Sequence, residues 1–239
     1  MSPRPDPGAE CAHASDRGLV RVGNEDRVFA RGGLLAVADG VGGGKAGETA
    51  AEIMIAELEG LADGASVPEL VASIERANRL VRDAGANDPS RAGMATTACV
   101  IALRDDHVDA VHVGDSRAYV LRAGTLDQIT EDHSLVAELV RSGAISPAEA
   151  AVHPNRNMIT RAVGAEDSII PEVTSVPTQM DDVVLVCTDG LSGQVSATDI
   201  ASIIVDARTL AEAAANLVAR ANGAGGMDNV SVVLARVVA

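Results

Sequence analysis

Aromatic side chains are almost absent from this sequence. Only 1% of its 239 residues are aromatic, with one Phe, one Tyr and no Trp, whereas 47% are hydrophobic. The core must therefore be filled by Val, Ala, Leu and Ile, and β-branched residues favour strands while Ala favours helices. A chain of this length can bury such a core unaided. The composition predicts an α+β fold in one sizeable domain.

Cysteine and long apolar runs are also scarce. The three cysteines, Cys11, Cys99 and Cys187, form no C-x-x-C pair, so neither a disulfide framework nor a zinc site is indicated. No stretch is long and apolar enough to span a membrane, and the Pro-rich first ten residues are unlike a signal peptide. We therefore expect a cytoplasmic protein with no membrane partner.

Positive charge is in short supply. The sequence has 19 Lys and Arg against 34 Asp and Glu, which gives a formal net charge of −15. Nucleic-acid binding depends on clustered Lys and Arg, so a nucleic-acid partner is not expected. The acidity has two interpretations: it keeps the protein soluble, or part of it belongs to carboxylates gathered around cations.

Several short apolar runs are typical of β-strands. They cover residues 34–38, 98–103, 108–113, 118–122, 183–187 and 230–238. Three of them follow one another closely between residues 98 and 122, and strands joined by short turns are antiparallel. The sheet is therefore not built from regular βαβ repeats.

Helix starts are indicated by capping boxes, in which a hydroxyl and a glutamate three residues later satisfy free backbone N–H groups. The pairs that fit are Ser66 with Glu69, Ser146 with Glu149, and Thr209 with Glu212. The first helix is expected from about Lys45 to Leu61, and an irregular stretch from 130 to about 169. Residues 1–10 are expected to form a flexible tail, and residues 11–239 a single domain.

Four aspartates share one local context, an apolar run that stops at Asp, usually beside Gly. They are Asp39, Asp115, Asp189 and Asp228. Each alone fits a plain turn, since Asp-Gly is a common turn dipeptide. Together they favour a cation site, because carboxylates that converge at one sheet edge repel one another unless protons or cations intervene. All-oxygen ligands suit Mg²⁺ or Mn²⁺, and Gly40 can turn its carbonyl toward such an ion without steric cost.

A polar segment upstream adds groups of complementary chemistry. The planar fork of Arg21 can clamp a phosphate, while Glu25 and Asp26 can hydrogen-bond water held by a cation. The alternative interpretation of this segment is a charged surface turn.

Taken in order, these residues resemble the motifs of the PPM/PP2C phosphatases, and the compact length is similar to that of bacterial members. The shared motifs are Arg21-x-x-x-Glu25-Asp26, Val37 to Gly43, Gly93 to Thr97, Val113 to Ala118, Thr188 to Leu191, and Asp228-Asn229. They cover nearly the whole chain, and as an ordered set they are highly specific. The resemblance implies a central antiparallel β-sandwich flanked by helix pairs on both sides, with a flap of residues about 133–165 beside the active site.

The resemblance also implies the cation ligands. Asp39 would bridge two tightly bound ions, Mn²⁺ or Mg²⁺, joined by the Gly40 carbonyl, Asp189 and Asp228. Asp115 and Asp189 would hold a third, weaker ion.

The implied activity is hydrolysis of phosphoserine and phosphothreonine in proteins, by water that the cations activate while Arg21 positions the phosphoryl oxygens. The partners would be phosphorylated proteins, with a Ser/Thr kinase acting in opposition, and we expect a monomer. Val41 departs from the pattern, because some animal members carry there a His proposed as general acid. The proton donor is therefore open between cation-bound water and His153.

Other functions compete with this one. The fold could serve as a catalytically weak module that binds phosphopeptides or senses metal. Loss of one or more of the expected metal-binding aspartates would favour that alternative, but none of them is missing. A phosphatase of small phosphoesters is the second alternative. Gly42-x-Gly44-x-x-Gly47 formally matches a dinucleotide fingerprint, yet the second parallel strand that this motif requires is not indicated. Among the histidines, His133 is expected to fix a turn or cap a helix, and His112 to be structural.

Overall fold

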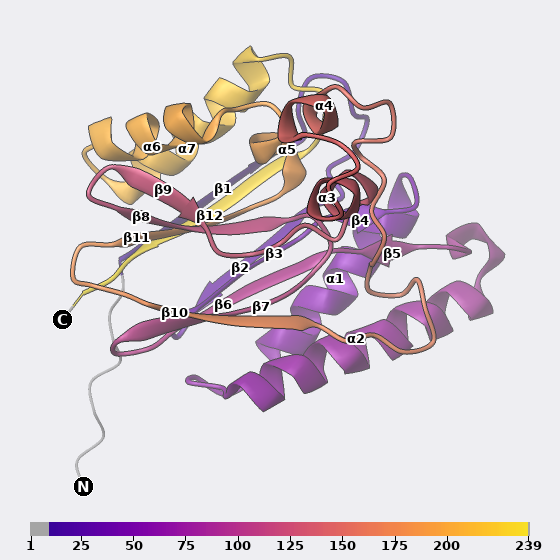
Figure 1. The fold of residues 1–239 in the computed structure, drawn as a ribbon. Coiled ribbons are helices and arrows are strands. Elements are labelled where there is room, and N and C mark those ends of the chain that lie inside the picture. The colour runs from indigo at the N-terminus through magenta and orange to yellow at the C-terminus, as the bar shows by residue number, and fades with distance from the viewer. Residues whose placement is uncertain (1–9, 239) are drawn as a thin grey trace, which may run out of the picture.

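Two antiparallel sheets lie face to face at the centre of the fold, and helices cover both outer faces (Figure 1). The computed structural model describes residues 10–238. One sheet has the strand order β1-β12-β11-β8-β9 and the other β10-β7-β6-β3-β2, while β4 and β5 form a separate pair. Helices α1 and α2 pack on the second sheet, and α6 and α7 on the first. The expected α+β sandwich is confirmed.

The strands are short, as their sequence runs suggest. Their bounds are β1 Cys11–Asp16, β2 Arg27–Arg31, β3 Leu34–Ala38, β4 Gly40–Val41, β5 Ala95–Thr96, β6 Ala98–Leu103, β7 His107–Val113, β8 Arg117–Arg122, β9 Thr125–Gln128, β10 Glu172–Pro177, β11 Val183–Cys187 and β12 Val230–Arg236.

The helices differ widely in length. Their bounds are α1 Lys45–Glu59, α2 Val67–Asn87, α3 Leu135–Arg141, α4 Pro147–Ala151, α5 Asp189–Ser192, α6 Ala197–Asp206 and α7 Leu210–Gly223, with a 3₁₀ turn, η1, at Pro89–Arg91. None of the described helices is long and apolar enough to cross a membrane.

Interior strands are buried on both faces, so their side chains divide between two cores. In β3, Leu34, Ala36 and Ala38 join the core beneath α1 and α2, whereas Leu35 and Val37 join the core between the sheets. Strand β11 divides in the same way between the inter-sheet core and the core beneath α6 and α7. A strand covered on both sides has no polar face, which explains its continuous apolar run.

The strands that sequence reasoning missed include all four sheet edges, β1, β9, β10 and β2. An edge strand is solvated along one side, and β1 and β10 both alternate between exposed and half-buried residues. Their apolar content is correspondingly low. A pattern search based on apolar runs therefore finds the interior of each sheet and overlooks its border.

Two of the three predicted capping boxes are complete in the structure, and the third has only one of its two hydrogen bonds. Ser66 with Glu69 and Ser146 with Glu149 form complete capping boxes. Thr209 accepts the Glu212 N–H, but the Glu212 carboxylate accepts from the backbone N–H of Arg208 instead of completing the box.

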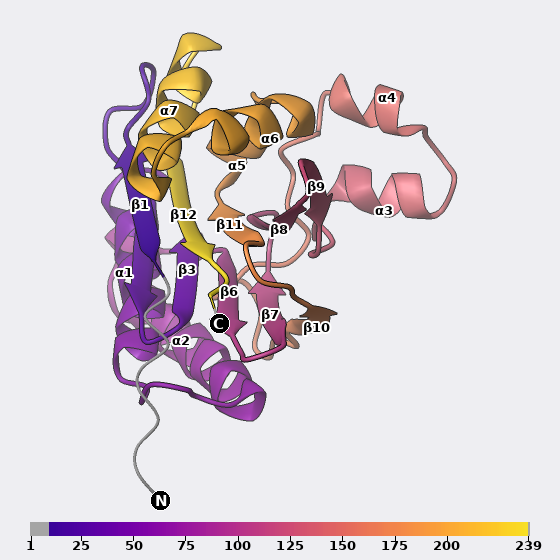
Figure 2. The same cartoon turned by 90° about the vertical axis from the view of Figure 1, so that its left-hand side faces the viewer.

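The expectation of an irregular stretch from 130 to 169 is wrong in part, since α3 and α4 lie within it. Neither helix contains a buried residue. Helix α3 has 7 residues, too few for apolar periodicity alone to mark a helix, and helix α4, with 5, is marked in the sequence only by its capping box at Ser146 and Glu149. In Figure 2 the two helices project from one side of the sandwich.

Most of the expected N-terminal tail, residues 1–9, lies outside the described residues. Glu10 does not belong to a free tail, because its carbonyl accepts the Arg236 N–H at 3.0 Å. Pairing of the first strand with β12 therefore extends back to residue 10.

Candidate active site

The four aspartates of the sequence motif lie at one end of the sandwich. Asp39 follows β3, Asp115 lies in the turn between β7 and β8, and Asp189 follows β11 as the first residue of α5. Asp228 differs from expectation, because it precedes β12 and does not end a strand. Strand β12 runs antiparallel to β11, so the start of β12 lies beside the end of β11. Asp228, just before β12, therefore lies at the same edge of the sheet as Asp189, just after β11.

Two cavities open at this edge. The smaller, of about 180 Å³, is lined by all four aspartates together with Arg21 and Glu25. The larger, of about 940 Å³, is lined by three of the four aspartates and by residues of α3, α4 and the segment after them. The expected flap, residues 133–165, therefore does border the aspartate cluster.

The carboxylates of this cluster raise one another's pKa. Burial raises the pKa of Asp39 well above its usual range, and the nearby charges of Asp26 and Asp189 raise it further. Burial, followed by repulsion from Asp189, raises the pKa of Asp115 to about 7. Asp189 shifts upward through burial and the charge of Asp228. So many anionic groups in one place form a site that a cation would stabilise.

Two carboxylate oxygens behind the cluster have no hydrogen-bond partner. Glu25 accepts the Gly44 N–H on Oε1 at 2.7 Å, whereas its buried Oε2 has no donor. Asp26 is 2% exposed, accepts the Thr188 hydroxyl on Oδ2 at 2.8 Å, and leaves Oδ1 without a donor. Burial raises the pKa of Asp26 to about 7, and the charge of Asp189 adds to the effect. Buried oxygens without donors fit a centre that holds hydrated cations.

Arg21 lies next to the cluster and is half exposed. Its Nη2 is 2.6 Å from Oδ2 of Asp228, and its side chain is 50% exposed. This contact places the guanidinium at the mouth of the smaller cavity, beside an expected cation ligand. The segment is thus more than a charged surface turn, because Arg21, Glu25 and Asp26 all approach the aspartates.

The comparison with protein families agrees with this geometry. A family model described as protein phosphatase 2C matches residues 22–232. The chain belongs to the protein phosphatase 2C family.

Two similar curated relatives from this phosphatase family are bacterial proteins. The serine/threonine protein phosphatase PstP of Mycobacterium tuberculosis is 42% identical over 231 residues, covering 95% of this chain but 45% of its own. The chain therefore spans less than half the length of that relative. The serine/threonine phosphatase stp of Listeria monocytogenes is 36% identical over 233 residues, covering 92% of both chains. The resemblance to bacterial members is confirmed.

Solved structures of family members share the fold. A crystal structure of the Mycobacterium tuberculosis serine/threonine phosphatase PstP/Ppp has a TM-score of 0.91 and 39% identity, covering 97% of this chain and 99% of that one. A structure of the PstP catalytic domain in complex with two manganese ions has a TM-score of 0.88 over the same shares of the two chains.

The packing around Gly40 of this phosphatase-family chain gives a further reason for a glycine at this position. It pairs with Thr96 in the β4–β5 ladder, and a Cβ built on Gly40 would lie 2.3 Å from the Gly47 carbonyl oxygen. The glycine thus lets α1 approach the Asp39 turn.

Thr96 and Thr97 hold the backbone of Asp39, a role that sequence reasoning did not assign. The Asp39 N–H donates to Thr97 Oγ1 at 3.0 Å, and its carbonyl accepts from the Thr97 N–H and the Thr96 hydroxyl, both at 2.9 Å. The motif that contains both threonines was the available signal. These bonds fix the backbone from which the Asp39 carboxylate extends.

Asn229 connects the two ends of the chain at the site. Its Oδ1 accepts the Glu25 N–H at 2.8 Å, and its Nδ2 donates to the carbonyls of Arg17 and Gly23, also at 2.8 Å. The amide therefore shapes the loop that carries Arg21, directly beside Asp228. Its place next to Asp228 was the only sequence signal for this role.

The expected alternatives for a proton donor are placed differently. Val41 is 39% exposed and lines the smaller cavity, as the position of the animal histidine suggests. His153 lines neither cavity, and its Nδ1 accepts the Asn155 N–H at 3.1 Å. This hydrogen bond and the position outside both cavities favour a role for His153 in stabilising a turn over a role in proton transfer.

Proposed function

We propose that this chain hydrolyses phosphoserine and phosphothreonine in proteins and that it requires divalent cations. The observation that carries the proposal is the convergence of Asp39, Asp115, Asp189 and Asp228 on one small cavity that also contains Arg21. The names of the relatives support the same activity, since PstP and stp are serine/threonine phosphatases. The reaction adds water across the P–O bond and releases inorganic phosphate and the free hydroxyl side chain.

The donor set fits Mn²⁺ or Mg²⁺. Asp39 would bridge two tightly bound ions, with Asp189, Asp228 and the Gly40 carbonyl as further ligands, and Asp115 with Asp189 would hold a third, weaker ion. Bound cations supply the positive charge that lowers the pKa of water and offsets the charge of a phosphoryl group. The raised pKa values of Asp39 and Asp115 support this assignment, because burial and neighbouring negative charges disfavour their ionised forms when no cation is present.

The side chains around the cluster would then divide the remaining work. Arg21 keeps N–H donors beyond its contact with Asp228 and can direct them at phosphoryl oxygens. Glu25 and Asp26 can accept hydrogen bonds from water around the ions on their unpartnered oxygens. No side-chain nucleophile is needed for this reaction.

The size of the larger cavity favours proteins over small phosphoesters as substrates. A phosphoryl group needs only the smaller space beside the aspartates, whereas about 940 Å³ next to it accommodates several residues of a peptide. Phosphorylated proteins, and the kinase that modifies them, are the partners in this proposal, without nucleic acid or membrane. We further propose that the protein acts as a monomer in the cytoplasm, with residues 11–239 as a single catalytic domain.

Removal of divalent cations should abolish this activity. We expect hydrolysis of a phosphothreonine peptide to depend wholly on added cation, to be highest with Mn²⁺, and to stop in excess EDTA, because the carboxylate cluster has no other source of compensating charge. Release of inorganic phosphate is the measurement, with a small aryl phosphate assayed in parallel. Undiminished turnover by protein shown to contain no metal would rule out the proposal. A marked preference for the aryl phosphate would favour the alternative of a small-phosphoester phosphatase, and tight peptide binding without turnover that of a binding module.

Replacing Arg21 with alanine should weaken substrate binding and spare the cations. Loss of one charged clamp costs about 1.5–3 kcal/mol, which is about one to two decades in kcat/KM, mostly through KM. Mn²⁺ binding should not weaken, because the variant loses a cation that competes for Asp228. Steady-state kinetics on a phosphopeptide, alongside Mn²⁺ titration, check both parts. An unchanged kcat/KM would reduce Arg21 to a surface charge.

A further inference from the structure

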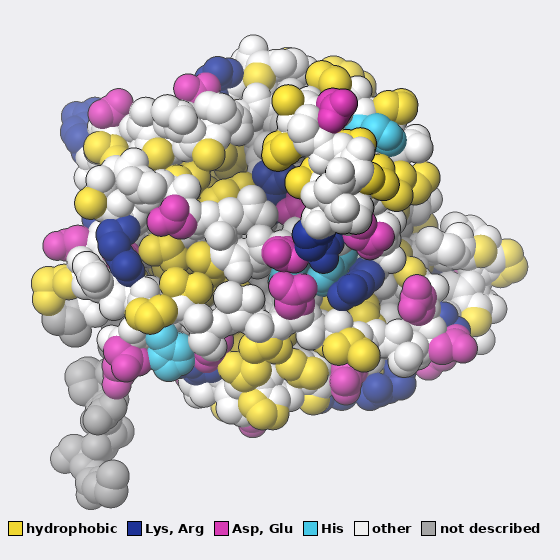
Figure 3. Space-filling model, viewed as in Figure 1, with side chains coloured by type: hydrophobic (Ala, Val, Ile, Leu, Met, Phe, Trp, Pro, Cys, Tyr) yellow, Lys and Arg dark blue, Asp and Glu magenta, His cyan; other side chains and the backbone are white. Residues whose placement is uncertain are grey.

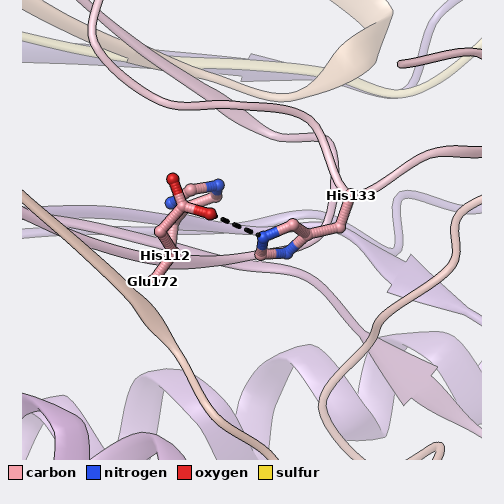
Figure 4. Close-up of side chains that lie close together, drawn as sticks. All are labelled: His112, His133 and Glu172. Carbon is pink, nitrogen blue, oxygen red and sulfur yellow. Dashed lines mark hydrogen bonds and ion pairs between the residues drawn. The ribbon is translucent and has the colours of Figure 1, made fainter. Parts of the chain in front are cut away.

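Two histidines and a glutamate form a cluster outside the aspartate site. His112 of β7 is fully buried, His133 is 2% exposed, and Glu172 begins β10. The two imidazole rings stack with centroids 4.7 Å apart and planes 13° from parallel, and Glu172 approaches the edge of His133 (Figure 4). Figure 3 shows acidic, basic and histidine side chains together on the face where α3 and β10 lie.

The cluster has the composition of a cation site but not its geometry. One ligand atom from each residue lies within 4.8 Å of the others. A ring nitrogen binds a metal in the plane of its ring, and two nearly parallel stacked planes cannot both point at one ion. Arg161 also brings a guanidinium nitrogen to 3.4 Å from His133 Nε2, where a cation would be repelled.

The hydrogen bonds of His133 indicate what the ring does instead. Its Nδ1 accepts the Gly114 N–H at 3.1 Å, and its own backbone N–H donates to the Gly114 carbonyl at 2.9 Å. Because Nδ1 accepts, the ring proton is on Nε2, which faces Glu172 Oε2 at 3.3 Å. Both polar groups of Gly114 are therefore held by a single residue.

Gly114 depends on this contact because of its own conformation. Its φ of +108° lies in the region that only glycine adopts readily, and a Cβ there would lie 2.6 Å from Thr97 Cγ2. On the far side of Asp115, the Ser116 hydroxyl is 2.7 Å from Thr97 Oγ1, the same oxygen that accepts the Asp39 N–H. Asp115 thus lies between two residues whose positions are fixed from outside the turn.

We propose that His133 is a positioning residue for the Asp115 cation site, acting through the Gly114 N–H. The inference rests on the proposed function, in which Asp115 and Asp189 hold the weaker cation. His133 lines neither of the two cavities, so it would act on Asp115 through the turn and not by direct contact. It sets the turn from which Asp115 extends, while the His112 stack and Glu172 set the orientation of the ring. Only two carboxylates serve this ion, so a small displacement of one removes a large share of its binding.

A matched pair of variants distinguishes the role of His133 Nδ1 from that of Nε2. His133→Asn places an amide oxygen near the position of Nδ1, where it can accept the Gly114 N–H. His133→Gln carries its amide one bond farther out and leaves that N–H without an acceptor. Mn²⁺ binding is measured by titration calorimetry without substrate, next to the Mn²⁺ dependence of phosphopeptide hydrolysis and thermal melting. We expect His133→Gln to weaken the weakest Mn²⁺ site by about 10- to 100-fold, and His133→Asn to stay within about threefold of the parent.

Glu172→Gln is the control, because it keeps an acceptor for His133 Nε2 and should bind Mn²⁺ as the parent does. Equal Mn²⁺ affinity in His133→Gln and the parent, or equal losses in the Asn and Gln variants, would overturn the proposal. So would a parent protein that binds only two Mn²⁺ ions. A His133→Gln chain that fails to fold would assign the contact to stability and would likewise overturn it. A parent that binds three ions but hydrolyses no phosphopeptide would refute the proposed function alone, since calorimetry still reports on His133.

Discussion

Replacing Asp39 with alanine should abolish both hydrolysis and tight cation binding. In the proposed function Asp39 bridges two ions, so its loss would remove a ligand from each of them. Removal of a single charge-stabilising group commonly costs a hundred- to a thousandfold in rate, and we expect a loss of at least about a thousandfold here. Phosphate release from a phosphothreonine peptide and Mn²⁺ stoichiometry are the measurements.

Thermal stability provides an independent test of the Asp39 assignment. The pKa of Asp39 is raised in the fold, so its ionised form opposes folding at neutral pH when no cation is present. In EDTA the Asp39→Ala variant should therefore melt no lower than the parent. Added Mn²⁺ should stabilise the parent, by about 2.7 kcal/mol at a hundred times its Kd, and leave the variant unchanged. A variant that melts far below the parent in EDTA would show that Asp39 is needed for the fold.

Replacing Asp115 with alanine should retain the fold and two tight ions but lose most of the activity. Asp115 lines the small cavity together with Asp39, and after burial the charge of Asp189 is the largest cause of its raised pKa. Its removal takes one of two carboxylates from the weaker ion. We expect a loss on the order of a hundredfold in kcat at moderate Mn²⁺. Turnover over a wide range of Mn²⁺ concentrations is the decisive measurement.

Asp127→Ala is a suitable control for the Asp115 experiment. Asp127 is an exposed aspartate of β9 that lines neither cavity, and its removal changes net charge by the same amount. It should leave turnover and Mn²⁺ stoichiometry unaltered. Full activity of Asp115→Ala at every Mn²⁺ concentration would show the third-cation assignment to be wrong. Unfolding of that variant would identify Asp115 as a structural turn residue.

The strands that could be predicted from the sequence are those that are covered on both faces by other parts of the fold. Strands β3, β6 and β11 match the expected runs at both ends, because burial on both sides leaves no room for polar residues. The capping boxes at Ser66 and Ser146 were predictable for a local reason, since the hydroxyl and glutamate satisfy N–H groups within three residues. The edge strands and helix α3 were not, because their burial is set by elements distant in the sequence.

The sequence by itself determined the chemical composition of the candidate site: three aspartates that follow apolar runs, a fourth, Asp228, that precedes one, and Arg21, Glu25 and Asp26 upstream. Only the tertiary structure decided how they meet. Asp228 joins the cluster because β12 starts where β11 ends, and antiparallel pairing cannot be read from either strand alone. The hydrogen bond from Gly114 to His133 likewise joins residues 19 positions apart, each with its own local role. Local patterns specify which groups are present, whereas the distances between them follow from packing that the whole chain imposes.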